Sequence, residues 1–309
     1  MTAVKEQPRA STVPTALAAL RGSLHHPCFS GEANMNRGRI HLPVSPVCNI
    51  RCRFCRRSFN KFENRPGVSA KLLKPENAAA LVKKALERCP EITVAGIAGP
   101  GDTLATRHAI DTFEIIHREY PRLINCLSTN GLLLEHYAAD LSRVGVKTLT
   151  VTVNAVDPVI LDRICSGIIL EGKIYQGIEG ADILIEAQKR GIKKAAALDL
   201  VIKINIVLIP GVNDKHIPVI AETAAGLGAS IINIIPLIPQ HEFAGWEAPD
   251  CAALGKAREE AERFLPVFRH CQHCRADAIG IPGRGDISSL IYGEEGSPYA
   301  SVEETFSHG

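Results

Sequence analysis

The ten cysteines of this 309-residue chain are its most informative residues. A loop with the pattern CxxxCxxC, formed by Cys48, Cys52 and Cys55, follows a short apolar run. Three thiolates at this spacing can hold three irons of a cubane [4Fe-4S] cluster and leave the fourth iron open to another ligand. Zinc is the alternative, but tetrahedral zinc sites prefer paired spacings and four protein ligands. The spacing therefore favours an iron–sulfur cluster with one open iron.

A second group of potential metal ligands lies near the end of the chain, at His270-Cys271-Gln272-His273-Cys274. Four ligands in five residues could hold zinc, although such tight spacing makes tetrahedral closure by all four awkward. Disulfide-dense scaffolds are small secreted domains with little core, whereas this chain is 46% hydrophobic and has no convincing secretory signal. We therefore expect a cytoplasmic protein, in which clustered cysteines more often bind metal or do redox chemistry.

The charge balance and the hydrophobic pattern argue against two classes of partner. Thirty-five Lys and Arg against 33 Asp and Glu leave a formal charge of +2, which gives no sign of a nucleic-acid partner. No uninterrupted apolar run approaches the roughly 18 residues needed to span a bilayer, so no membrane partner is expected. Specificity must therefore come from a defined site.

From Arg39 onward, short β-branched runs alternate with amphipathic stretches, which is the pattern of βα units around a parallel sheet. The expected strands are 40–44, 92–97, 123–128, 148–153, 201–208 and 231–236. The expected helices are 75–88, 106–120, 135–144, 178–190, 215–227 and 250–264. Six such units predict an α/β fold with an open, partial (βα)6 barrel rather than a closed eight-fold barrel.

The chain divides into three expected parts. Residues 1–24 mix Pro, Ala, Ser and charge without periodicity, which predicts a flexible leader. Residues 25–268 form the barrel core, since no break in composition occurs within 39–264. Residues 269–309 carry the C-terminal CxxC segment and a Gly/Ser-rich tail that would cover the barrel. The length of the chain by itself would suggest two domains.

Gly, Asn and Cys residues gather directly after the expected strands. In parallel βα folds, ligands bind at the carboxyl ends of the strands, where the loops converge. The segments at this rim are 48–55, 98–102, 129–131, 154–155 and 210–214. Each could be an ordinary turn, where these residue types are common, but their shared position predicts one site.

The CxxxCxxC loop and the partial barrel together resemble the radical S-adenosylmethionine (SAM) superfamily. In that superfamily the open iron chelates the amino and carboxyl groups of SAM, and an electron from the cluster cleaves the sulfonium to a 5′-deoxyadenosyl radical. The resemblance implies that Gly99, Pro100, Gly101 and Asp102 belong to the segment that contacts the SAM amino group. It also makes Asn154 a candidate for the ribose hydroxyls or the carboxylate of SAM, with Thr129 and Asn130 as further SAM-binding candidates.

Several other segments resemble the NifB family of nitrogenase cofactor biosynthesis proteins. They are HPCFS at 26–30, ENRP at 63–66, CQHCRADA at 271–278, and the later-strand segments 207–218 and 233–239. The resemblance runs from about residue 25 to residue 280, and the first three segments form a highly specific set. Because the chain stops soon afterwards, it resembles the standalone form without the NifX-like C-terminal domain that some members append.

Members of this family carry two further [4Fe-4S] clusters, K1 and K2, as substrates. For K1 the resemblance points to Cys28, His41 and Cys126, although a lone strand histidine is more often structural. For K2 it points to Cys271 and Cys274, with at least one ligand unassigned. With the SAM-binding cluster, this makes three [4Fe-4S] clusters in all.

The family motif also makes Glu63 and Arg65 candidate catalytic residues at the cluster site, with Glu63 a possible oxygen ligand or proton acceptor. Most charged loop residues are instead solvated salt bridges, which is the alternative for this pair. Cys89, Cys165 and Cys251 remain over, and we expect them to pack as buried small hydrophobes.

The resemblance implies a carbide-inserting cluster synthase. One SAM would methylate a K2 sulfide, a second SAM would yield the radical that abstracts hydrogen from that methyl, and fusion of K1 and K2 with an extra sulfur would give an [8Fe-9S-C] precursor. The implied partners are a NifX-like carrier, a NifEN-like maturation scaffold, an iron–sulfur donor protein and a reductant such as ferredoxin. The alternatives are a radical SAM enzyme acting on a peptide or small molecule with auxiliary clusters, and a passive iron–sulfur carrier.

Overall fold

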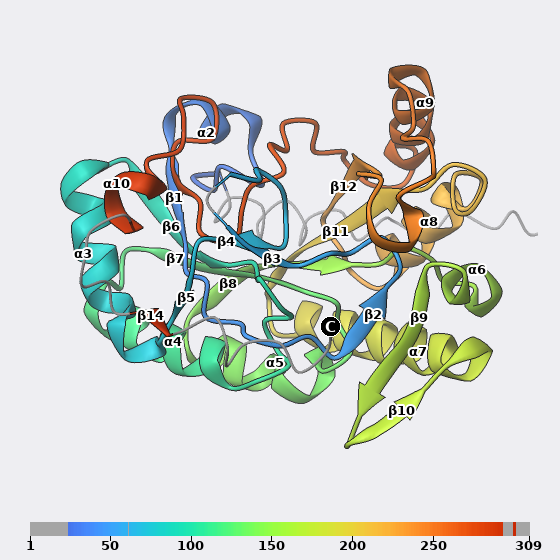
Figure 1. Ribbon diagram of the computed structural model, residues 1–309, viewed down its shortest axis with the longest axis horizontal. Coiled ribbons are helices and arrows are strands. Elements are labelled where there is room, and N and C mark those ends of the chain that lie inside the picture. The colour runs from blue at the N-terminus through green and yellow to red at the C-terminus, as the bar shows by residue number, and fades with distance from the viewer. Residues whose placement is uncertain (1–23, 61, 293–298, 301–309) are drawn as a thin grey trace, which may run out of the picture.

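The computed structural model of the chain describes residues 24–60, 62–292 and 299–300. Its centre is a curled seven-stranded sheet with the order β12-β11-β8-β7-β6-β1-β13 (Figure 1). The first six strands of this order are parallel, and β13 (Ile279–Gly280) pairs antiparallel with β1 at one edge. The two outer strands do not pair with each other, so the sheet forms an open, partial barrel.

All six predicted strands are confirmed to within a few residues. Their bounds are β1 (Gly38–His41), β6 (Ile92–Ile97), β7 (Ile124–Thr129), β8 (Val146–Thr152), β11 (Val201–Leu208) and β12 (Ile231–Pro236). These sequences form strands because β-branched side chains fit a pleated surface that is covered on both sides. Strands that follow one another in these units are neighbours in the sheet, which is the usual arrangement of consecutive strands.

The predicted helices are also confirmed, and most cover the outer face of the sheet (Figure 1). They are η1 (Pro75–Asn77) with α3 (Ala78–Arg88), α4 (His108–Glu119), α5 (Leu134–Arg143), α7 (Gly177–Ala196), α8 (Ile217–Gly226) and α9 (Cys251–Glu262). Helix α7 runs six residues further than predicted, since Ile192 and Ala195 continue its buried face. A side chain at Gly191 would meet Leu134 of α5 at 2.8 Å, so this glycine permits close helix packing.

The main core lies between the sheet and these helices. It includes residues with no exposed surface on both layers, such as Ile110 and Phe113 on α4, Leu149 on β8 and Ile204 on β11. Burying each such side chain contributes about 1.5–3 kcal/mol relative to leaving it exposed. The barrel wall is therefore rigid enough to position loops and interior side chains.

An antiparallel hairpin was missed by the sequence prediction. β9 (Cys165–Leu170) and β10 (Lys173–Tyr175) form it, and β9 also pairs with β2 (Ile50–Cys52), which lies inside the CxxxCxxC loop. Cys52 and Cys165 are partners in this register. The short helix α6 (Pro158–Asp162), whose N-cap is Asp157, precedes the hairpin. The cysteine loop is thus held by a separate three-stranded sheet with the order β10-β9-β2.

The segment that precedes the barrel in the sequence and the segment that follows it lie side by side in the structure. Helix α2 (Gly31–Asn36) comes from the first and α10 (Ser288–Tyr292) from the second, and Asn34 donates a hydrogen bond to the His270 carbonyl. The remaining short strands are β3 (Ser58–Phe59), β4 (Val68–Ser69), β5 (Leu72–Leu73) and β14 (Tyr299–Ala300). The predicted leader lies outside the described residues apart from Leu24.

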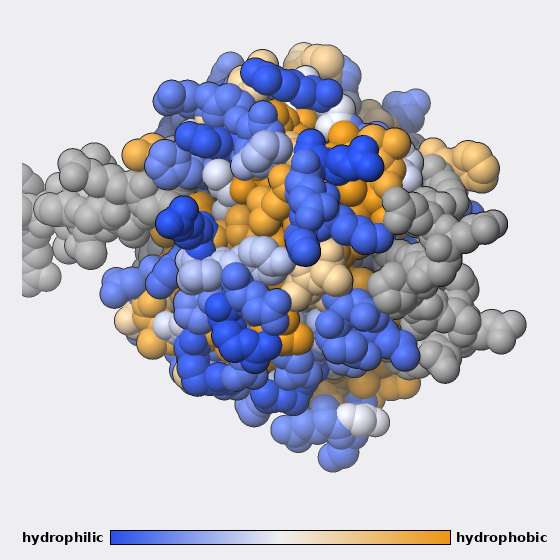
Figure 2. Space-filling view, turned by 90° about the vertical axis from the view of Figure 1, so that its left-hand side faces the viewer, coloured by the Kyte–Doolittle hydropathy of each residue, from blue (hydrophilic) through white to orange (hydrophobic). Residues whose placement is uncertain are grey.

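The surface on the side of α3 and α10 is largely hydrophilic, with hydrophobic side chains gathered near its centre (Figure 2). Within the described part of the chain, no helix combines the length and the apolar character that a bilayer crossing requires.

Candidate functional site

The CxxxCxxC loop forms one wall of a cavity of about 230 Å³. The opposite walls come from the loops that follow β6 and β7, which places the cavity at the carboxyl ends of the strands. Its predicted SAM and cluster residues are Cys48, Cys52, Cys55, Pro100, Gly101, Asp102, Thr129 and Asn130. Three thiols facing one cavity fit the donor set of a [4Fe-4S] cluster with an open iron.

Gly101 brings the glycine-rich segment against the cysteine loop. Its amide donates to the Ser45 carbonyl at 2.8 Å, and the Asp102 amide donates to the Val47 carbonyl at 2.9 Å. A Cβ at position 101 would lie 2.1 Å from the Val47 carbonyl oxygen, so only glycine fits this approach. The spacing between the SAM segment and Cys48 is thereby fixed by backbone contact.

Gly101→Ala should therefore displace the cysteine loop and lower SAM cleavage by about 100-fold, since ångström-scale misplacement can cost that much. Production of 5′-deoxyadenosine from SAM measures this effect. Gly255→Ala on α9 is the matched control, because nothing lies within 4 Å of its added Cβ. Unchanged turnover in Gly101→Ala would show that the loop does not depend on this approach.

The buried carboxylate of Asp102 organises the loop after β7. It accepts hydrogen bonds from the Asn130 amide at 2.6 Å, the Leu104 amide at 3.0 Å and the Thr129 hydroxyl at 3.0 Å. Burial raises the pKa of this carboxyl, and the three donors act in the opposite direction. Asn130 in turn donates to Asn49 Oδ1 at 2.7 Å, beside Cys48. Asp102 and Asn130 thus connect the SAM segment to the cysteine loop.

The cysteine thiols of this cavity hold their protons at neutral pH. Burial, with a smaller contribution from Asp102, raises the pKa of Cys48 to about 12. A hydrogen bond with Cys165 is the main cause that raises the pKa of Cys52, and burial raises that of Cys55. Iron ligation requires thiolates, so cluster binding must release these protons.

Two of the predicted rim residues do not line the cavity. The side-chain oxygen of Asn154 accepts from the Val207 amide at 2.9 Å, and its carbonyl accepts from the Asn213 side chain at 2.9 Å. Asn213 also bonds the backbone at Ile209, so segment 210–214 closes the end of β11. Gly99 is likewise outside the lining. Thr152 and Asn205, which the sequence prediction did not select, line the cavity instead.

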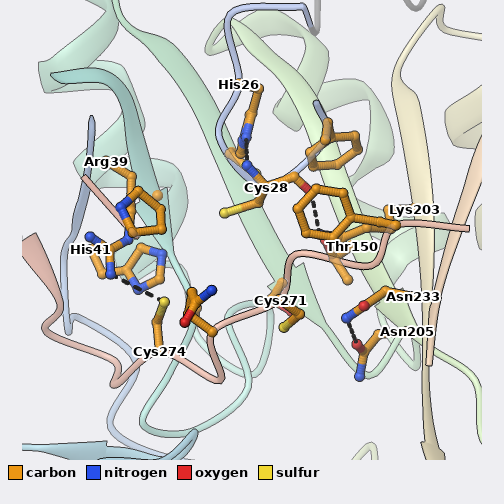
Figure 3. A pocket seen from close by; sticks show the side chains of 18 of the residues that line it. His26, Cys28, Arg39, His41, Thr150, Lys203, Asn205, Asn233, Cys271 and Cys274 are labelled. Atoms are coloured by element: carbon orange, nitrogen blue, oxygen red, sulfur yellow. Dashed lines mark hydrogen bonds between the residues drawn. The ribbon is translucent and has the colours of Figure 1, made fainter. Parts of the chain in front are cut away.

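A second cavity, also of about 230 Å³, lies deeper in the barrel and contains all five remaining cluster-ligand candidates (Figure 3). They are Cys28, His41, Cys126, Cys271 and Cys274. The flanking Phe29 and Phe268 pack against Val201 and Ile231, which begin their strands. The two terminal segments therefore enter from the amino ends of the strands, opposite the cysteine loop.

The two cavities adjoin inside the barrel. Their shared lining residues are Pro66, Ala98, Ser128, Thr152, Asn205 and Ile235. Thr152 and Asn205 are partners on neighbouring strands, and Asn205 accepts from the Asn233 side chain at 2.7 Å. A polar wall made by these strands thus faces both spaces.

His41 is presented in the form that can bind metal. Its Nδ1 lies 2.9 Å from the Arg275 carbonyl, which can only accept, so Nδ1 carries the proton and Nε2 has a free lone pair. Burial, with help from Arg39, lowers the pKa of His41 to about 4. A Cβ on Gly96 would lie 3.1 Å from the His41 ring, so that glycine makes room for the imidazole.

The low pKa of His41 predicts an acid-sensitive fold in the metal-free protein. Between pH 6.5 and about 4 the unfolded chain binds a proton that folded His41 rejects, so stability falls as pH falls, by on the order of 3 kcal/mol. His41→Gln should lose less stability across this window in urea unfolding. His136→Gln, at an exposed position on α5, is the control. Equal losses in His41→Gln and the parent protein would contradict the assignment.

Two thiols of the second cavity, those of Cys28 and Cys126, hold their protons before metal binds. Burial raises the pKa of Cys28 to about 12 and that of Cys126 to about 11. Cys274 accepts a hydrogen bond from Arg39 Nη2 at 3.1 Å. No three His, Cys, Asp or Glu side chains of the described residues converge tightly enough for a single metal ion. The ligands of a cubane lie further apart, so the zinc alternative at 270–274 gains no support from this geometry.

Glu63 and Arg65 line neither the first cavity nor the second. Their side chains form a salt bridge with each other, and Glu63 also accepts from Asn60 at 2.9 Å. Arg275 donates to the Glu63 carbonyl at 2.6 Å and forms a two-bond ion pair with Asp277. The two side chains thus form the salt bridge of the alternative interpretation, and their catalytic role stays a prediction.

The three leftover cysteines have different environments. Cys89 and Cys165 are buried, as predicted, with 8% and 5% exposure, but Cys251 is exposed in the first turn of α9, so that prediction was wrong. The error arose because an apolar neighbourhood in sequence did not reveal which side of the helix faces solvent. Cys165 also contacts Cys52, which only the missed hairpin could reveal.

Comparison with known proteins identifies the family. The model of the Radical SAM superfamily matches residues 42–224. The FeMo cofactor biosynthesis protein NifB of Methanocaldococcus infernus is 49% identical over 258 residues, covering 83% of this chain and 85% of that protein. That of Methanocaldococcus jannaschii is 48% identical over 286 residues, covering 92% and 95%. The chain belongs to the NifB family of the radical SAM superfamily.

The NifB of Klebsiella pneumoniae is 41% identical, and its match covers 84% of this chain but 57% of that protein. Among solved structures, Streptococcus suis SuiB bound to S-adenosylmethionine has a TM-score of 0.55 at 12% identity, over 74% of this chain and 49% of SuiB. At that identity the likeness supports the partial barrel alone. Membership of the NifB family makes the chain a radical SAM enzyme, and the family implies SAM and a [4Fe-4S] cluster.

Proposed function

We propose that this NifB-family enzyme takes part in FeMo cofactor biosynthesis by fusing two [4Fe-4S] clusters, K1 and K2, into an [8Fe-9S-C] precursor. The observation that carries the proposal is the pair of adjoining cavities inside one barrel. One contains the CxxxCxxC thiols and the other contains five further candidate ligands from both ends of the chain. A radical formed in the first cavity would reach a substrate held in the second.

The proposed reaction uses two SAM molecules. The first would donate its methyl group to a sulfide of the K2 substrate. Cys48, Cys52 and Cys55 would hold the cluster, which when bound would supply the electron for reductive cleavage of the second. Loss of further protons from that carbon, joining of K1 to K2 and one added sulfur complete the product. The difficult steps belong to SAM and the clusters, while the protein positions them and excludes water.

The chain's own residues divide between the two substrates. Cys28, His41 and Cys126 are proposed to hold K1, and the Arg275 carbonyl orients His41 for this role. Cys271 and Cys274 are proposed to hold K2. Two thiolate ligands bind a cluster only weakly, which suits a cluster that is consumed in the reaction.

The Glu63–Arg65 loop is proposed to shape the passage between cavities. Pro66, the next residue, lines both, and Arg65 donates to the Arg56 carbonyl beside the cysteine loop. The proposed partners are an iron–sulfur donor, a reductant such as ferredoxin, and a NifX-like carrier or NifEN-like scaffold that receives the product.

Anaerobic reconstitution with iron counting, followed by SAM addition and transfer to cofactor-deficient nitrogenase, tests the function. We expect about twelve irons per chain, for three cubanes, and restored nitrogenase activity. Cleavage of SAM without a transferable product would favour an enzyme acting on a peptide or small molecule. No consumption of SAM under reducing conditions would leave only a passive carrier.

A further inference from the structure

Lys203 is a buried cation at the meeting point of the two terminal segments. It lies on β11 with 6% exposure, and its ammonium donates to the Cys28 carbonyl at 2.8 Å. The same ammonium lies 4.6 Å from the centre of the Phe29 ring and 5.2 Å from that of Phe268. Phe29 follows Cys28, and Phe268 precedes Cys271, so one lysine contacts both cluster-bearing segments.

The surroundings of Lys203 contain no counter-charge. No Asp or Glu lines the second cavity, and no carboxylate of the described residues forms an ion pair with Lys203. Cation–π contacts offset only part of the free-energy cost of burying an unpaired charge. The cavity is therefore suited to bind an anion beside Lys203.

A second buried cation, Arg39, also lies beside a candidate cluster ligand, although Asp286 is near enough to interact with its charge. Arg39 has 3% exposure, donates to the Gly280 carbonyl at 2.6 Å and to Cys274 at 3.1 Å, and has a buried Nε with no partner. Lys203 lies toward Cys28 and Arg39 toward Cys274, so one cation stands beside a ligand of each proposed substrate cluster. Thiolate-ligated cubanes are anions, so their charge is complementary to that of these two cations.

We propose that Lys203 is a positioning residue for the K1 cluster, whose negative charge its ammonium balances while it holds Cys28 against β11. This inference rests on the proposed function, because it requires clusters in the second cavity. A lysine that only joined Phe29 to Phe268 would need no charge, since an apolar side chain could pack there.

Lys203→Gln removes the charge and keeps a hydrogen-bond donor, and Lys203→Arg keeps the charge. Lys147→Gln is the matched control, because Lys147 is an exposed lysine on the neighbouring strand β8. Reconstituted proteins are compared by iron content, by the midpoint potentials of their clusters in an EPR-monitored titration, and by 5′-deoxyadenosine production. The iron-free proteins are compared by urea unfolding.

We expect Lys203→Gln to bind about four fewer irons, or to shift the midpoint potential of an auxiliary cluster to more negative values, because loss of a nearby cation disfavours reduction. 5′-Deoxyadenosine production should persist, and Lys203→Arg should restore the iron content. The iron-free Lys203→Gln protein should be at least as stable as the parent, since it no longer buries an unpaired charge.

Parent-like iron content and potentials in Lys203→Gln would overturn the proposal. So would a less stable iron-free Lys203→Gln protein, because that result indicates a purely structural role. If Lys203→Gln does not fold, the test is Lys203→Arg, which keeps the charge. Loss of iron from folded Lys203→Arg would then overturn the proposal. A parent protein that binds only about four irons would refute the proposed function, independently of Lys203.

Discussion

Replacing Cys48 with alanine should abolish 5′-deoxyadenosine production from SAM and remove about four irons per chain. Cys48 faces the cavity that also contains Gly101 and Asn130, and its loop is fixed to the glycine-rich segment by backbone hydrogen bonds. With two thiols left, the cluster lacks one of its three protein ligands. Cys48 is a better position for this test than Cys52, because Cys52 lies beside another thiol, Cys165, that could replace it as a ligand.

The measurement is product formation in anaerobically reconstituted protein, together with iron content. Cys251→Ala is the control, because Cys251 is an exposed cysteine outside both cavities. It should keep the parent's iron content and activity. Parent-like SAM cleavage by Cys48→Ala would exclude the CxxxCxxC loop as the SAM-cleaving centre.

Replacing Cys126 with alanine should remove about four irons while SAM cleavage continues. Cys126 lies inside β7 and faces the second cavity with Cys28 and His41, away from the CxxxCxxC loop. Loss of a K1 ligand should leave the SAM-binding cluster intact and stop formation of the fused product. The two activities that the parent protein couples would then separate.

EPR spectra, iron counts and transfer to cofactor-deficient nitrogenase measure the separation. Cys89→Ala is the control, since Cys89 is also a buried thiol but packs in the main core with α3. We expect it to retain its irons. Full iron content and normal product transfer in Cys126→Ala would remove Cys126 from the K1 site.

The parallel strands and the cysteine loop were predictable because their signals are local. Runs such as 201–208 and 231–236 are continuous and β-branched, and they match β11 and β12 residue for residue. The hairpin of β9 and β10 was missed because its pairing with β2 joins residues more than 100 positions apart. Asn154 was placed in the SAM site by its rim position, but the Val207 amide takes up its side-chain oxygen.

The interlocking of the family motifs was equally invisible in the sequence. The arginine and aspartate that follow Cys274 could have been ligands, acids or structural residues. Their burial together, and the bond from Arg275 to the Glu63 carbonyl, show that the motif near the end of the chain holds the motif at 63–66. Such a contact spans 212 positions and depends on the barrel that brings both segments to one edge.

The sequence by itself determined that packing could not explain most of the ten cysteines, that three of them have cluster spacing, and that the chain contains six βα units. Only the tertiary structure decided how the other thiols are grouped. The terminal segments bring Cys28, Cys271 and Cys274 to the barrel interior from the amino ends of the strands, opposite the CxxxCxxC loop. Local sequence cannot encode that arrangement, because it arises from Phe29 and Phe268 packing on the barrel around Lys203.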